Sequence, residues 1–122
     1  MGTQLQIQSD EQSAYQFLIF HIRTVKTFQV GDKISAGQKL GNHIGSQTMS
    51  DIAVGVSTTN GWKLISYFQL MPDSLFALYQ NRGITKRETM IITKEARDAD
   101  TLTCNGDAFF SEGTLPNWVV LK

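Results

Sequence analysis

The chain has 122 residues, eleven basic and eleven acidic side chains that give a formal net charge of zero, and 41% hydrophobic against 18% charged residues. This length suits one domain with one core, and the balanced charge offers no basic field that would hold nucleic acid or an anionic membrane. The longest apolar run, residues 17–20, is far shorter than the roughly 20 residues of a membrane-spanning helix. We therefore expect a single soluble domain, residues 1–122, that binds no nucleic acid and has no membrane span.

The first half of the chain has the pattern of short β-strands. Residues 14–22 (AYQFLIFHI) are dense in aromatic and β-branched side chains, which predicts a strand buried on most of both faces, with Ile19 and Ile22 on opposite faces. The glycines in residues 31–37 then indicate tight turns between short strands. Residues 39–45 (KLGNHIG) predict one further strand.

Residues 50–57 (SDIAVGVS) predict another strand, in which Ile52, Val54 and Val56 share the face that should point to the core. The dipeptide Asn60-Gly61 follows, and between two strand-like runs it is a strong signal for a hairpin with a type I′ turn, whose two central residues both need positive φ. The second strand of that hairpin is expected to continue through residues 62–70.

The period then changes to that of helices. Residues 72–83 predict a short amphipathic helix that opens near Pro72 and closes at Gly83. Residues 85–88 (TKRE) have the form of a capping box, and a further helix is expected from Thr93 to Asp98. The sequence thus predicts a mainly β fold with an α-helical C-terminal part: a β core over 14–71, a helical appendage over 72–100, and a C-terminal extension over 101–122 that folds back on the rest.

Residues 30–41 (VGDKISAGQKLG) resemble the Gly-Asp-x-x-x-x-Gly-Gln-x-x-Gly segment of lysostaphin-type (LytM-type) zinc endopeptidases and, less closely, of biotinyl and lipoyl carrier domains. In the peptidase family an aromatic-x-His strand precedes this segment, and residues 15–22 match it with His21 at the histidine position. The resemblance covers about a third of the chain. It implies a short-stranded barrel or sandwich of the barrel-sandwich hybrid type.

The chemistry of that family does not carry over with the scaffold. Residues 49–56 (MSDIAVGV) align with the family's His-x-His strand, so that Asp51 and Ala53 stand where the two zinc-binding histidines would be. The earlier His-x-x-x-Asp motif has no counterpart, and a catalytic zinc needs about three protein ligands. We therefore expect no catalytic residues, no bound metal and no cofactor. The carrier-domain alternative fails as well, because Lys63 lacks the flanking residues of a modified lysine.

The function expected from these observations is that of a non-catalytic, peptidase-like binding or scaffolding domain. Its ligand is expected to be a glycan, a peptidoglycan-type glycopeptide or a protein partner. The predicted ligand-binding side chains form a polar floor and are His21, His43, Asp51 and Ser57. A groove lined by Trp62, Tyr67 and Trp118 is a further option, since aromatic faces bind sugars or peptides as well as filling cores.

Two alternatives stay open at this point: a divergent zinc metallopeptidase, and a chain that is the C-terminal part of a longer protein whose N-terminal half carries the His-x-x-x-Asp motif. In a divergent metallopeptidase a zinc site could be rebuilt from His21, His43 and Asp51, with Cys104 as a further candidate ligand. Against this, His21 also fits a hydrogen-bonded histidine at a strand end, and His43 also fits a turn or exposed strand residue. Cys104, the single cysteine, excludes a disulfide framework and fits a turn thiol. An incomplete barrel would leave strand edges open, which predicts a homodimer by sheet pairing. The resemblance implies the cell envelope or secretion, although no signal peptide is visible.

Overall fold

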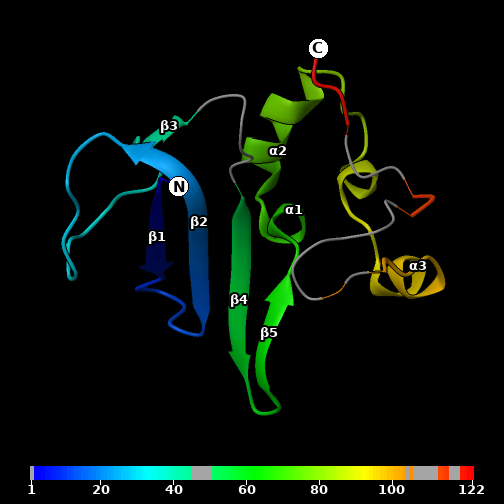
Figure 1. Ribbon diagram of the computed structural model, residues 1–122. Coiled ribbons are helices and arrows are strands. Elements are labelled where there is room, and N and C mark those ends of the chain that lie inside the picture. Colours follow the sequence, from blue (N-terminus) through cyan, green and yellow to red (C-terminus); the bar gives the residue numbers. More distant parts are fainter. Residues whose placement is uncertain (1, 45–50, 104, 106–112, 116–118) are drawn as a thin grey trace. The chain divides into compact units, whose positions relative to one another are not determined.

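The computed structural model describes residues 2–44, 51–103, 105, 113–115 and 119–122. Its contacts divide the chain into two compact units, Met1–Tyr67 and Phe68–Lys122. The first unit holds an antiparallel β-sheet and the second holds short helices (Figure 1). The expected order of a β part followed by a helical part is confirmed, with the change just before the predicted boundary at residues 71 and 72.

The sheet is open and antiparallel. It runs in the order β1-β2-β4-β5, and β3 pairs with the end of β2 (Figure 1). The described strands do not close into a barrel, because β1 pairs only with β2 and β5 pairs only with β4. β1 is an addition to the predicted strands, although its alternation of polar and apolar residues is visible in the sequence. The strands are β1 (Thr3–Gln8), β2 (Tyr15–Thr24), β3 (Gly41–His43), β4 (Ile52–Thr58) and β5 (Gly61–Ile65).

A β-bulge interrupts β2 near its end. Thr3 pairs with Ile22 and Leu5 pairs with Ile19, so one residue of β1 lies opposite two of β2, Phe20 and His21. His21 has φ 56°, and it is the non-glycine residue with positive φ among those described. The extra residue shifts the alternation, so Ile22 returns to the face that carries Ile19. The prediction that these two isoleucines lie on opposite faces was therefore wrong.

One face of the sheet is aliphatic and aromatic. The pairings of β2 with β1 and β4 place Val54 on this face, and it is fully buried, whereas Ile52 on the same face is 46% exposed. The prediction that Ile52, Val54 and Val56 share a face is confirmed. We call this the aliphatic face; it is made of Leu5, Ile7, Tyr15, Phe17, Ile19, Ile22, Ile52, Val54 and Val56.

The β4–β5 hairpin is confirmed, but its turn differs from the expected one. Thr58 pairs with Gly61, so the two-residue connection is Thr59-Asn60, and Gly61 has φ 96° whereas Asn60 does not have positive φ. A type I turn followed by a left-handed glycine explains this geometry. The Thr58 hydroxyl supports the turn, since it accepts from the Asn60 N–H at 3.1 Å and donates to the Gly61 carbonyl at 2.6 Å. β5 ends at Ile65, so the strand expected through residue 70 is too long.

The segment that resembles the peptidase motif forms two turns of the same design. In residues 29–32 and 35–38 the N–H of the fourth residue donates to the carbonyl of the first at 3.0 Å, and glycine at the third position has φ 94° or 79°. The side chain of the fourth residue, Asp32 or Gln38, accepts from the N–H of the first at 3.0 Å. The predicted tight turns are confirmed, but no strand forms between them.

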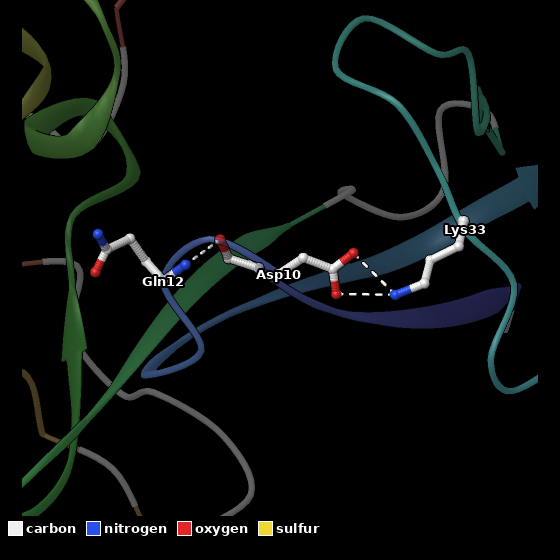
Figure 2. Close-up of polar contacts among 4 residues, drawn as sticks. Asp10, Gln12 and Lys33 are labelled. Atoms are coloured by element: carbon white, nitrogen blue, oxygen red, sulfur yellow. Dashed lines mark hydrogen bonds and ion pairs between the residues drawn. The ribbon is translucent and has the colours of Figure 1, made fainter.

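An ion pair ties this loop to the turn between β1 and β2. Figure 2 shows Lys33 reaching Asp10, with Nζ to carboxylate oxygen distances of 2.9 and 2.8 Å. The same turn is closed by the N–H of Gln12, which donates to the Ser9 hydroxyl at 3.0 Å. Both charged side chains are exposed, and pairs of this kind contribute at most about 1 kcal/mol. The ion pair therefore orients the loop more than it stabilises the fold.

The described residues from Tyr67 onward form four short helices, and Met71, Phe76 and Ile84 are buried among them or close to them in the chain. The expected helix after Pro72 is confirmed, and Gly83, with φ 94°, follows its end. The helices are α1 (Tyr67–Leu70), α2 (Asp73–Gln80), the 3-10 helix η1 (Arg87–Met90) and α3 (Lys94–Ala99).

Two further helix starts were predicted, and one of them is correct. Thr93 caps α3, because its hydroxyl accepts from the Ala96 N–H at 3.1 Å. The capping box of residues 85–88 is wrong: η1 begins after Lys86 and no side chain caps it. The chain from Arg87 onward is instead fixed by tertiary contacts, since the Arg87 guanidinium donates to the carbonyls of Phe68 and Met71.

The described C-terminal residues contact the helical unit, as expected of a chain that folds back. The Lys122 N–H donates to the Arg82 carbonyl at 2.9 Å. The Asp100 carboxylate accepts from the N–H groups of Thr114 and Leu115 at 2.6 and 2.8 Å. Cys104, Phe109, Phe110 and Trp118 lie outside the described residues.

Candidate functional site

Three of the four predicted ligand-binding residues have their backbone at one end of β2. His21 lies in the bulge, and its neighbour Ile22 pairs with His43 of β3. The carbonyl of Asp51 accepts from the N–H of Phe20, the other bulge residue, at 2.9 Å. Neither histidine is free of partners. Among the described residues, no group of three or more His, Cys, Asp or Glu side chains is arranged to hold a metal ion.

The structure does not bring Ser57 to the other three. Ser57 lies near the far end of β4, where its N–H donates to the Ala14 carbonyl at 2.9 Å and its strand partner is Trp62. Six residues of strand at about 3.3 Å each separate it from Asp51, a span of about 20 Å. One polar floor cannot include both side chains.

A hollow of about 370 Å³ lies on the aliphatic face, beside the point where β2 changes partner. Residues 15–19 of β2 pair with β4 and residues 22–24 pair with β3, so the bulge sits between the two partner strands. Because the bulge returns Ile22 to the face of Ile19, both isoleucines line the hollow together with Ile52 of β4. The irregularity in β2 is therefore the cause of the site.

The described lining combines an aliphatic floor with a polar rim. Leu40 adds to the three isoleucines, and among the described lining residues there is no Asp, Glu, Phe, Tyr or Trp. Of the predicted site residues, His43 lines the hollow, whereas His21, Asp51 and Ser57 do not. The rim and the segment leading to β3 consist of Gln38, Lys39, Gly41, Asn42 and His43.

The aromatic groove considered from the sequence is not located by the described residues. Trp62 lies on the face opposite the hollow. It pairs with Ser57, whose side chain alternates with those of Val54 and Val56 on the aliphatic face. Trp118 is among the residues that are not described.

Sequence reasoning missed Lys39 and the isoleucine floor. Lys39 lies in residues 30–41, where the glycines carry the resemblance. The bulge that brings Ile19 and Ile22 to one face is not indicated by any pattern in the sequence of β2. Within the described part of the chain, no helix has the length and apolar character that crossing a bilayer requires.

No protein-family model matches this chain, and neither a curated protein nor a solved structure is significantly similar to it. The lysostaphin-type resemblance therefore stays a prediction that rests on residues 30–41 and on the strand before them.

Proposed function

We propose that the chain is a non-catalytic binding domain whose site is the hollow between β3 and β4 on the aliphatic face. The observation that carries this proposal is an aliphatic floor that is exposed in part. Ile52 is 46% exposed there, beside the half-buried Ile19 and the buried Ile22. Covering such a surface with an apolar group of a partner is favourable, at about 25 cal/mol per Å² removed from water.

The lining favours a peptide or protein segment over a glycan. Sugars are held by the faces of Trp, Tyr or Phe and by many hydrogen-bonding groups, whereas the described lining has none of these three residues and an aliphatic floor. The volume of about 370 Å³ is near the lower end of the range of ligand sites. It accommodates one or two side chains, so a peptidoglycan-type glycopeptide would enter through its peptide part.

The relationship to lysostaphin-type peptidases and to their barrel-sandwich fold is part of the proposal, as a scaffold without zinc ligands. Asp32 and Gln38 of the shared motif close turns through their side chains, so a local structural reason accounts for them without metal chemistry. No observation favours the alternative of a zinc peptidase built from His21, His43 and Asp51. Pairing of two copies through the open edges of β1 or β5 stays a prediction.

The proposal is tested by titrating the full chain, labelled with nitrogen-15, with the dipeptides acetyl-Gly-Leu and acetyl-Gly-Leu amide while amide shifts are recorded. At about 0.3 kcal/mol per heavy atom, ligands of this size should bind with a Kd on the order of 0.1–1 mM. We expect shifts at residues 38–43 and at Ile52. If neither peptide causes saturable shifts at residues 38–43 or at Ile52, the proposal is refuted.

A matched pair of variants distinguishes binding in the hollow from nonspecific association with exposed apolar side chains. Ile52→Thr removes an exposed aliphatic side chain from the hollow, and Leu64→Thr removes one that is 63% exposed on the opposite face. Both variants place threonine, which is β-branched and favourable in strands, at a strand position. Ile52→Thr should weaken binding at least threefold and Leu64→Thr should leave it unchanged; equal effects would place binding elsewhere.

A further inference from the structure

The rim of the hollow carries one uncompensated charge. Lys39 is the charged side chain among the described lining residues, and no hydrogen bond or ion pair joins it to another described residue. The other two lysines of the same loop are engaged, Lys33 with Asp10 at 2.8 Å and Lys26 with Asp32 at 4.0 Å. Lys39 is thus available for an anionic group of a ligand.

The backbone around Lys39 is held in place on both sides. The turn over residues 35–38 is closed by Gln38 directly before it, and the carbonyl of Leu40 directly after it accepts from the Val25 N–H at 3.0 Å. These hydrogen bonds therefore fix the backbone from which the Lys39 side chain extends at the rim of the hollow.

We propose, building on the function proposed above, that the hollow binds the carboxyl end of a peptide whose last side chain is aliphatic. The side chain would cover Ile19, Ile22 and Ile52, and the terminal carboxylate would meet Lys39. In a peptide C-terminus the carboxylate and the last side chain leave the same carbon atom, so the two groups are close enough for a hollow of about 370 Å³. An aliphatic floor with a single cation beside it is complementary to a group that combines an apolar side chain with one negative charge.

The test compares acetyl-Gly-Leu, which ends in a carboxylate, with acetyl-Gly-Leu amide, which does not. The acid should bind about two- to fivefold more tightly, as expected for one solvent-exposed ion pair. Raising sodium chloride to 0.5 M should weaken binding of the acid peptide and leave binding of the amide peptide unchanged, because salt screens exposed charges.

Lys39→Met should reduce the affinity for the acid to that for the amide without changing the latter. Lys63→Met is the matched control, since it removes the same charge from β5, away from the hollow. If acid and amide bind equally, or if both variants act alike, the inference fails while the proposed function stands. If neither peptide binds, both fail. Hexanoate is the third ligand: tighter binding of hexanoate than of the peptide acid would make the occupant a fatty acid and overturn the peptide assignment.

Discussion

Replacing Gly55 with alanine should destabilise the sheet by displacing one indole ring. Gly55 is buried in β4, and a Cβ atom added to it would lie 2.1 Å from Cζ2, 2.3 Å from Cε2 and 2.4 Å from Nε1 of Trp62. These distances are far below van der Waals contact, and all three atoms belong to the Trp62 indole, which lies over the glycine. Since Trp62 is 48% exposed, its ring can swing into solvent, so the alanine variant folds at the expense of that contact.

The magnitude follows from the area that the ring covers. A fully buried aromatic side chain removes about 150–250 Å² from water, so a half-covered tryptophan removes about 100 Å², which is about 2.5 kcal/mol at about 25 cal/mol per Å². Alanine in a strand interior regains about 0.5–1 kcal/mol relative to glycine, which has more conformational freedom to lose. The free energy of unfolding should therefore fall by about 1.5–2 kcal/mol.

Urea denaturation followed by far-UV circular dichroism measures this loss, and unchanged m-values check that the transition itself is unaltered. The decisive comparison repeats Gly55→Ala in a Trp62→Thr background, where no ring occupies the space. There the alanine should be neutral or stabilising by up to about 1 kcal/mol. An equal loss in both backgrounds would refute the reasoning, because the cost could not then arise from the indole.

Two predictions concern the helical unit. Arg87 is only 20% exposed, donates to two backbone carbonyls and to Asp73, and lies 4.8 Å from the centre of the Phe76 ring, so Arg87→Met should lower the free energy of unfolding by about 2–3 kcal/mol. Arg87→Lys should recover less than half of it, because an ammonium cannot reproduce the planar fork; full recovery in urea denaturation would contradict this. N–H groups of Leu115 and Thr114 lower the pKa of Asp100, so its contribution to stability is complete above the ordinary aspartate pKa of about 3.9 and is lost as the pH falls through the lowered value. The stability difference from Asp100→Asn, measured by thermal melts, should be constant above about pH 5 and vanish toward pH 2, and a pH-independent difference would argue against this carboxylate.

Elements with a local cause were predictable from the sequence. The turns of residues 29–38 need only a glycine and a side-chain acceptor at fixed spacing, and the cap of Thr93 needs only its hydroxyl and the next turn of helix. The alternation of residues 52–56 identified a strand and its buried face without any knowledge of its partners. In all three cases the interacting groups lie within four residues of each other in the chain.

The candidate site was predictable only in part, and the reason is again one of distance along the chain. Asp51 and Ser57 share a face by alternation, but the length of β4 keeps them about 20 Å apart. His43 does line the hollow, yet it does so because β3 pairs with the end of β2, a contact between residues some twenty positions apart. The role proposed for Lys39 depends on Ile19, Ile22 and Ile52, which only the folded sheet brings beside it.

The amino-acid sequence by itself determined a neutral chain with a β part before a helical part, the positions of its turns, and the lack of the zinc-ligand motifs of the family it resembles. Only the tertiary structure decided that the sheet stays open, that the bulge at His21 turns Ile22 to the face of Ile19, and that a hollow forms where β2 changes partner. The physical reason is that a bulge and a change of strand partner are set by the pairing of distant strands, whose register no local pattern encodes.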